Sequence, residues 1–322
     1  MVTAGTLAEV VRGDLVESVH RGHLVVLAPD GRVVVEVGDP DAVIWPRSSL
    51  KPLQAVAMLA AGLDVDDEGL ALACASHSGT DVHLAVVRRV LDAAGLAEAD
   101  LRNTPDLPLD ADAAFAWRAA GRGPTSLTQN CSGKHAAMLA TCVAAGWDVR
   151  SYLDPGHPLQ QAVRATVEGL TGVPVASTSV DGCGAPLLST TVRGLARALG
   201  RIAAAASTDA PADAAATDDA ATTAATTAAR TGTAADGPRA PLARVARAMS
   251  SRPDLVGGPG RDVTAVMRAV PGLVAKDGAE GVYAAGLPDG SGVAFKVEDG
   301  SGRPRPAVLV AALAQALAAA GH

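Results

Sequence analysis

The chain has 322 residues, a formal net charge of -7 and a sequence pI near 5.5, and 48% of its residues are hydrophobic although only 2% are aromatic. The acidic balance without a basic stripe argues against a nucleic-acid partner, and the few aromatics argue against base stacking or a sugar-binding cleft. No apolar run reaches the roughly 18–20 residues of a membrane span and no export signal is visible at residues 1–11, so we expect a cytoplasmic protein whose four cysteines are reduced thiols.

Two hairpins of the same design are predicted near the two ends of the chain. β-Branched runs flank a Pro29-Asp30-Gly31 turn over residues 22–37, and similar runs flank Pro288-Asp289-Gly290 over residues 281–297. Between and after the hairpins, apolar residues recur with helical spacing, and the short run Leu70–Ala73 fits either helix or strand. The expected helices are Leu50–Ala61, Val82–Ala94, Lys134–Ala145, Leu159–Leu170, Leu242–Met249 and Pro306–Ala320.

Strands at both ends with helices between them predict a single α+β domain over residues 1–322, in which the N- and C-terminal hairpins join in one antiparallel sheet flanked by helices. One segment, Ala203 to Ala240, contains no aliphatic residue larger than Ala. Such a segment cannot bury enough apolar surface to offset its ordering entropy. We therefore expect a low-complexity, disordered insertion at 203–240 that carries no chemistry.

The first reactive motif, Arg47-Ser48-Ser49-Leu50-Lys51-Pro52, opens a predicted helix. Ser48 and Lys51 stand at positions i and i+3, which makes them neighbours on one helical face. A lysine whose pKa is lowered by burial can take the proton of a serine hydroxyl and turn the serine into a nucleophile. The S-x-x-K pattern is common, however, and a serine that only caps the helix is the simpler interpretation of the motif alone.

Two further segments place polar residues at turns. Cys74-Ala75-Ser76-His77-Ser78-Gly79 fits either the wall of a pocket or a polar turn around a hydrogen-bonded histidine. Lys276-Asp277-Gly278 leads into the second hairpin, and a K-x-G element on an edge strand is typical of serine acyl-transfer sites. The tripeptide says little alone, but its place after an S-x-x-K motif in an α+β chain gives it weight.

A thiol, an amine and an imidazole are gathered in Asn130-Cys131-Ser132-Gly133-Lys134-His135, directly before an apolar helix. Asn130 is a suitable N-cap, so Cys131 is expected at the positive end of the helix dipole, which favours a thiolate. Asp181-Gly182-Cys183-Gly184 holds another cysteine between glycines. Cys131, Lys134 and Cys183 could bind zinc together, or the two thiols could simply be buried.

In this order the motifs resemble the rhizobial-type L-asparaginases, also called class 3 or the asparaginase II family. The matching blocks are residues 47–52, 74–78, 130–135, 181–183 and 276–279, and Met249–Arg261 also fits; the resemblance fails only over the insertion. The family resemblance implies hydrolysis of the side-chain amide of asparagine, on a fold similar to serine β-lactamases and glutaminases. It also implies a homodimer.

The resemblance further implies roles for individual residues. Ser48 would be the nucleophile and Lys51 its base, while Ser76 and Lys276 would form a second serine–lysine pair that relays protons.

The same resemblance makes Cys131, Lys134 and Cys183 the ligands of one Zn2+ ion that shapes the pocket. For substrate binding we consider Arg47, His135 and Asp181, with Arg47 or His135 expected to hold the substrate carboxylate. Backbone N–H groups at the start of the Ser48 helix are the natural oxyanion donors.

The predicted reaction is the hydrolysis of L-asparagine to L-aspartate and ammonia through an ester on Ser48. Two alternatives stay open. One is another serine amidohydrolase, such as a glutaminase or a β-lactamase-like hydrolase, although the missing export signal argues against a cell-wall role. The other is a non-catalytic zinc-holding binding module whose serines only cap helices.

Overall fold

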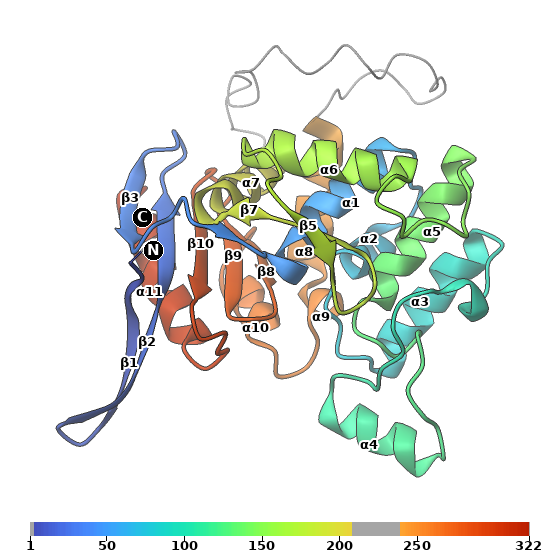
Figure 1. Ribbon diagram of the computed structural model, residues 1–322, viewed down its shortest axis with the longest axis horizontal. Helices are drawn as coiled ribbons and strands as arrows, with labels where there is room; N and C mark the ends of the chain where they lie inside the picture. Colours follow the sequence, from blue (N-terminus) through green and yellow to red (C-terminus); the bar gives the residue numbers. More distant parts are fainter. Residues whose placement is uncertain (1–2, 208–238, 322) are drawn as a thin grey trace.

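An antiparallel sheet of six strands forms the centre of the computed structural model, which describes residues 3–207 and 239–321 (Figure 1). The strand order is β1-β2-β10-β9-β8, and β3 pairs with part of β2. The two predicted hairpins are β2 (Leu15–Leu27) with β3 (Val33–Val37), and β9 (Val282–Gly286) with β10 (Gly292–Val297). β2 and β10 pair directly, so the predicted union of the two hairpins in one sheet is confirmed.

The first strand was not expected from the sequence. β1 (Gly5–Arg12) pairs with the first half of β2 and extends the N-terminal hairpin into a two-stranded ribbon that projects from the rest of the structure (Figure 1). Val11 and Leu15, at the far end of this ribbon, are 57% and 75% exposed. The ribbon therefore contributes little to the core of the described residues.

Helix α7 (Val192–Ala204) packs against β9 and β10 through two glycines that pair across these strands. A Cβ atom on Gly286 would lie 2.0 Å from the carbonyl oxygen of Leu199, and one on Gly292 would lie 2.2 Å from that of Ala196. Helix α11 (Arg305–Ala319) contacts β2, β3 and β10. β9 is buried along its whole length and β10 almost so, which requires cover on both faces of the sheet, and the predicted α+β class is confirmed.

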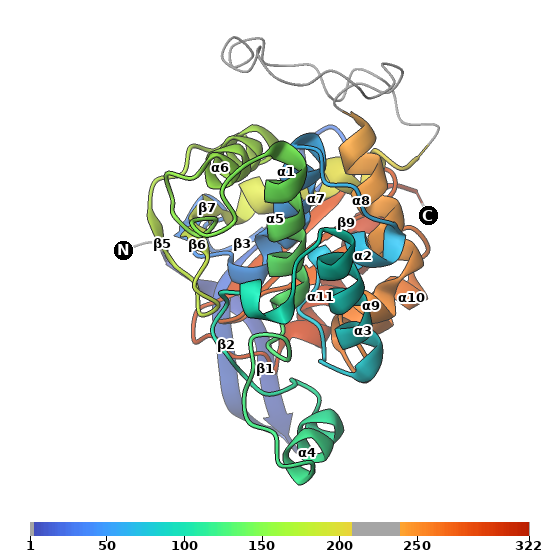
Figure 2. The same ribbon diagram turned by 90° about the vertical axis from the view of Figure 1, so that its right-hand side faces the viewer.

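Most of the remaining helices pack beside the sheet, whereas α4 (Ala111–Ala119), which has no buried residue, lies apart from them (Figure 2). Every helix expected from the sequence is present with its ends shifted by at most three residues, and Leu70–Ala73 lies in a helix. Two short strand pairs, β4 (Val43–Ile44) with β7 (Thr190–Thr191) and β5 (Thr178–Val180) with β6 (Pro186–Leu188), complete the fold. The helices are α1 (Lys51–Ala60), α2 (Asp67–Ala73), α3 (Asp81–Ala93), α4 (Ala111–Ala119), α5 (Ser132–Ala145), α6 (Pro158–Thr171), α8 (Arg239–Ser251), α9 (Pro253–Val256) and α10 (Asp262–Ala269), with 3-10 turns η1 (Arg47–Leu50) and η2 (Glu98–Asp100).

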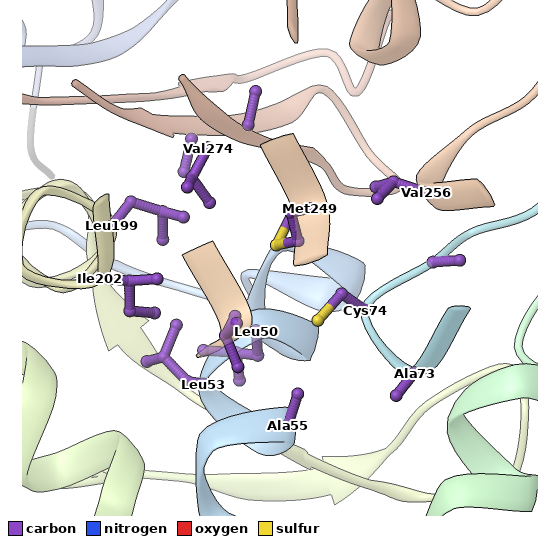
Figure 3. Packing of buried hydrophobic residues seen from close by; sticks show 14 of the residues in the cluster. Leu50, Leu53, Ala55, Ala73, Cys74, Leu199, Ile202, Met249, Val256 and Val274 are labelled. Atoms are coloured by element: carbon purple, nitrogen blue, oxygen red, sulfur yellow. The ribbon is translucent and has the colours of Figure 1, made fainter. Parts of the chain in front are cut away.

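The core fixes the junction of η1 and α1, where the S-x-x-K motif stands. Leu50 and Leu53 are 1% and 0% exposed, and they lie near Leu199, Met249 and Val274, which come from α7, α8 and β8 (Val274–Asp277) (Figure 3). Burying one leucine side chain stabilises a fold by about 2 kcal/mol. The two leucines therefore anchor the turn that carries Ser48.

The predicted insertion at 203–240 is helical at both of its ends. α7 continues to Ala204 and α8 begins at Arg239, whose guanidinium donates to the carbonyl oxygens of Ala204 at 3.3 Å and Ser207 at 3.0 Å. Residues 208–238 lie outside the described residues, so the disorder expected for them stays a prediction. Among the described helices, none combines the length and apolar character needed to cross a bilayer.

Candidate active site

A cavity of about 390 Å³ opens where η1, the Ser76 turn, the start of α5 and the end of β8 meet. Ser48 and Ser76 both line it, as the sequence predicts for two residues of one site. Leu109, just before α4, contributes an apolar wall. The remaining lining residues are Asn130, Arg261, Asp277, Gly278, Ala279 and Arg305.

Ser48 is held by a strained turn. The preceding residue, Arg47, has a φ of 53°, a left-handed conformation that costs a non-glycine residue on the order of 1 kcal/mol or more. Its guanidinium Nε donates to Asp181 Oδ1 at 2.7 Å, which pins the turn against the loop that carries Cys183. Burial would raise the pKa of Asp181, but the charges of Lys134 and Arg47 outweigh it and lower the pKa.

Lys51 bridges the two serine segments from inside the protein. It is 1% exposed, and its Nζ donates to the carbonyl oxygen of Ala75 at 2.5 Å and to Ser76 Oγ at 3.1 Å. Ser48 precedes Lys51 by one turn on the same chain segment. A buried amine that touches a cavity-lining hydroxyl next to Ser48 has the placement that a proton acceptor needs.

Lys276 is fully buried on the edge strand β8, where the sequence predicted a lysine. Its Nζ donates to the carbonyl oxygen of Asp277 at 2.7 Å and also to Asp277 Oδ1. Burial lowers the pKa of Lys276 to about 8 although Asp277 opposes this shift, and the nearby charge of Lys51 lowers it further. The hydrogen bonds among the described residues thus join Ser76 to Lys51, and Lys276 to Asp277, rather than Ser76 to Lys276.

The Gly257-Gly258-Pro259-Gly260-Arg261 block delivers an arginine to the cavity. Gly258 has a φ of 129°, and a Cβ there would lie 2.3 Å from Ser78 Oγ, so the block can approach the Ser76 turn only with glycine. Arg261 Nη1 donates to the carbonyl oxygen of Ser76 at 3.2 Å, and its Nη2 donates to Asp277 Oδ2 at 2.7 Å. Arg261 therefore connects the turn of one serine to the strand of Lys276.

Cys131, Lys134 and Cys183 come together behind the cavity, as the sequence predicts for a zinc site. Cys131 and Cys183 are buried in one small cluster, and Lys134 Nζ donates to Cys183 Sγ at 3.2 Å. Cys131, not Asn130, occupies the N-cap position of α5, with a φ of -102°, and the helix begins at Ser132 rather than at Lys134. The Asn130 Oδ1 atom instead accepts a hydrogen bond from Cys131 Sγ at 3.2 Å.

The favoured thiolate is Cys183, not Cys131. A hydrogen bond between the two thiols lowers the pKa of Cys183 against the effect of burial, and the charge of Lys134 adds to this. The same hydrogen bond, together with burial, raises the pKa of Cys131. The expectation that the helix dipole would ionise Cys131 is therefore wrong, because its partner and its burial outweigh the dipole.

Cys131 and Cys183 could form a zinc site with Lys134 only if the lysine amine is itself a ligand. Within the described part of the chain, no group of three or more His, Cys, Asp and Glu residues is placed to hold a metal ion. Two cysteine sulfurs and one amine, all within a buried cluster, nevertheless make a three-donor set of the kind that zinc accepts with a fourth position open. Lys134 would have to lose its proton; burial favours this loss, but the neighbouring groups, above all Cys183, together oppose it more strongly and raise the pKa of Lys134.

The substrate-binding candidates lie outside the cavity wall formed by the described residues. His135 is buried, and its Nδ1 shares a hydrogen bond of 2.8 Å with the hydroxyl of Tyr152. Arg47 and Asp181 are engaged with each other at 2.7 Å. The charged side chains on the cavity wall are instead those of Arg261, Asp277 and Arg305. The neutral amide of Asn130 also lines the cavity.

Sequence reasoning missed Arg305, Asn130 and Leu109 as cavity residues. The sequence assigns Asn130 only a capping role, although it stands beside Cys131. Arg305 opens the final helix, far along the chain, and its Nη1 lies 3.7 Å from Asp277 Oδ2. No local pattern distinguishes such an arginine from an ordinary surface charge.

Comparison with known proteins supports the family suggested by the motifs. A sequence model of the L-asparaginase II family matches residues 8–229 and 211–321. No curated protein shows significant sequence similarity to the chain.

Among solved structures, a crystal structure of Mglu in its tris and glutamate form matches with 16% identity and a TM-score of 0.43, over 91% of this chain. The chain spans only 58% of that protein's length. A β-lactamase from Mycobacterium bovis matches with 15% identity and a TM-score of 0.37, over 92% of this chain and 94% of that one. Matches at these scores do not bear on activity. The family model, however, spans nearly the whole sequence, and the chain therefore belongs to the L-asparaginase II family.

Proposed function

We propose that this protein is an amidohydrolase that converts L-asparagine to L-aspartate and ammonia, with Ser48 as the nucleophile and Lys51 as its base. The observation that carries the proposal is the convergence of Ser48, Ser76 and the buried amine of Lys51 at one cavity. A serine needs an adjacent base to attack an amide, and a buried amine bonded to a cavity hydroxyl can serve as one. Family membership supports the reaction class, and the geometry supports the choice of these residues.

In the proposed reaction, Lys51 takes the proton of Ser48, and Ser48 Oγ forms a bond to the side-chain amide carbon of asparagine. The tetrahedral intermediate collapses with cleavage of the carbon–nitrogen bond, and ammonia leaves with a proton returned by the lysine. Water then attacks the aspartyl ester, its proton passes to the same base, and the base returns a proton to Ser48 Oγ as aspartate leaves. The Ser76 hydroxyl, 3.1 Å from Lys51 Nζ, offers a path for these protons.

Ammonia release from asparagine by Ser48→Ala tests the nucleophile. We expect a fall of at least about 1,000-fold in kcat, because an active-site serine forms the covalent bond itself. Ser250→Ala is a matched control, since Ser250 lies at the end of α8 and its hydroxyl bonds only to its own helix. Wild-type turnover by the Ser48 variant would rule out the proposed chemistry.

A substrate panel tests the specificity. Asparagine, glutamine and a chromogenic β-lactam are compared at equal concentration, and asparagine is expected to have the highest kcat/KM. A preference for glutamine or the β-lactam would replace the asparaginase assignment while leaving the serine mechanism intact.

We also propose one Zn2+ ion per chain, held by Cys131, Lys134 and Cys183. A bound zinc ion would supply Lewis acidity and a rigid link between α5 and the 181–184 loop. The support is the meeting of the three donors in one buried cluster. Metal analysis of reductant-treated protein should find about one zinc per wild-type chain and none in Cys183→Ser; zinc retained by that variant would contradict the ligand assignment.

A homodimer in the cytoplasm completes the proposal. The family resemblance supports the dimer, and all four cysteines are free thiols within the described residues, as a reducing compartment requires. Light scattering should give twice the chain mass of 32.0 kDa, and a monomer at micromolar concentration would contradict the dimer. Cell fractionation tests the location.

A further inference from the structure

The carboxylate of Asp277 is buried and has several cationic side chains as partners. It is 5% exposed, and its Oδ1 accepts a hydrogen bond from Lys276 Nζ. The outer oxygen, Oδ2, lies 2.7 Å from Arg261 Nη2 and 3.7 Å from Arg305 Nη1. Buried beside Lys276 alone, this carboxylate would hold the lysine in its charged form.

Lys276 has several other charged or titratable neighbours. Lys51 on α1 and Arg261 before α10 both disfavour the charged form of Lys276, and the buried thiol of Cys74 lies within electrostatic range. Tyr283 pairs with Asp277 across the sheet, and Arg305 stacks over the Tyr283 ring at 5.9 Å. Asp277 is therefore the group among these that favours a charged Lys276, and Lys51 and Arg261 oppose it.

We propose that Arg261 is a positioning residue for Lys276: by holding the outer oxygen of Asp277 and the Ser76 turn together, it leaves Lys276 able to give up its proton. This inference rests on the proposed function and on the proton-relay role beside Ser76 that the family resemblance gives to Lys276. Arg261 acts twice in the same direction. Its positive charge repels a charged Lys276, and its hydrogen bond draws the negative charge of Asp277 away from the amine.

Arg261 holds two segments together through directed hydrogen bonds, in addition to the effect of its charge. A planar guanidinium can donate to two acceptors in fixed directions, and here the two acceptors are the carbonyl oxygen of Ser76 and the carboxylate of Asp277. The glycines at 257 and 258 let the segment approach the Ser76 turn, where the carbonyl oxygen of Gly257 accepts from Ser78 N at 2.9 Å. The glycine-rich block therefore places Arg261 between the Ser76 turn and the end of β8, where Lys276 lies.

The small number of lysines makes a direct test practical. The chain contains only Lys51, Lys134, Lys276 and Lys296, so lysine labelled with 13C at Cε gives few NMR signals, and Lys276→Arg identifies the signal of Lys276. Titration of the wild-type protein without substrate should show this signal changing with a midpoint near the pKa of about 8. In Arg261→Met the midpoint should rise by about one pH unit, which lowers the neutral fraction at pH 7 roughly tenfold.

Graded variants separate this coupling from a general loss of structure. Arg305→Met should give a smaller rise, because Arg305 lies farther from Asp277. Arg268→Met is the matched control and should give none, since Arg268 is 62% exposed and pairs with Asp254. If Arg261→Met does not fold, Arg261→Gln removes the same charge with a side chain that can still donate one hydrogen bond.

The pH dependence of kcat/KM should change together with the Lys276 midpoint. The acid limb of kcat/KM for asparagine should move to higher pH in the Arg261 variants and stay in place in Arg268→Met. An unchanged Lys276 midpoint in both Arg261 variants, or a wild-type signal that does not titrate below pH 10, would overturn the inference. Because the NMR titration needs no substrate, it decides the role of Arg261 even if asparagine proves to be the wrong substrate.

Discussion

Two buried histidines should make the protein sensitive to mild acid. His77 and His135 are both 0% exposed, and burial lowers the pKa of each well below the usual 6.5. His77 Nε2 shares a hydrogen bond of 2.8 Å with Ser132 Oγ, and His135 Nδ1 one of 2.8 Å with Tyr152. The second nitrogen of each ring has no partner among the described residues, so no acceptor is available there for an added proton.

The size of the effect follows from proton linkage. Below pH 6.5 the unfolded chain binds a proton at each histidine and the folded protein does not, so the free energy of unfolding falls as the pH falls. Each histidine contributes about 1.4 kcal/mol per pH unit, and the pair should cost about 4 kcal/mol between pH 7.5 and pH 5.0. That is a large part of the roughly 5–15 kcal/mol that stabilises a typical domain.

The carboxylates change the free energy of unfolding at lower pH than the histidines do. The pKa of Asp277 is lowered because the charges of Lys276, Arg261 and Arg305 outweigh its burial, so its contribution to stability is lost only as the pH falls below the usual carboxyl value of about 4.

Two other groups also act between pH 6.5 and pH 5.0: the pKa of His83 is lowered by burial, and the pKa of Cys183 is lowered to about 4, so each makes the free energy of unfolding fall with pH in this range. The share of His77 is therefore the difference between the wild type and a His77 variant. Urea unfolding followed by tryptophan fluorescence, with EDTA present so that metal release plays no part, measures it.

The variant His77→Asn supplies the comparison. It removes one titrating ring while keeping a side chain that can hydrogen-bond to Ser132, so the pH-dependent loss should shrink by about 2 kcal/mol from the wild-type value. A free energy of unfolding that stays constant from pH 7.5 to pH 5.0, at unchanged urea dependence, would refute the argument. An equally steep loss in His77→Asn would show that other groups cause it.

Three further predictions concern single side chains. Gly286→Ala should lower the free energy of unfolding by about 3 kcal/mol, because its Cβ would lie 2.0 Å from Leu199 O; thermal melts that match the wild type would contradict this. Gly169→Ala, on an exposed stretch of α6 with nothing within 4 Å, should instead raise it by about 0.5–1 kcal/mol in the same assay. Lys51→Met should reduce kcat for asparagine by at least about 100-fold while the near-UV circular dichroism stays native, and retained turnover would exclude Lys51 as the base.

Much of the fold could be predicted from periodicity, but helix α7 could not. Its apolar residues recur with helical spacing, yet Gly194 and Gly200 lower the helix propensity of the segment. The structure shows why glycine stands there: a Cβ on Gly200 would lie 2.3 Å from the carbonyl oxygen of Gly290. Close packing against the sheet thus requires the residue that counts against the helix, and no local pattern reveals that requirement.

Motifs predicted Ser48, Lys51 and Ser76 near one another because each stands in a short, distinctive segment. They could not predict which lysine contacts Ser76, since Lys51 and Lys276 come from segments that only the tertiary fold brings together. The ionisation of the two cysteines was beyond the sequence for a similar reason. A dipole argument applies to Cys131 alone, whereas the outcome depends on its hydrogen bond to Cys183, which lies about fifty residues away.

The contact between the end of α7 and the start of α8 determines where the chain should tolerate insertions. Arg239 reaches the carbonyl oxygens of Ala204 and Ser207, so the polypeptide leaves the body and returns to it at one place. Closing a longer or shorter connection between two points already in contact changes the free energy by only about 0.6 kcal/mol per doubling of length. This junction is therefore a natural insertion point, where a foreign domain or a short glycine–serine linker could replace residues 208–238 while the rest of the protein stays folded.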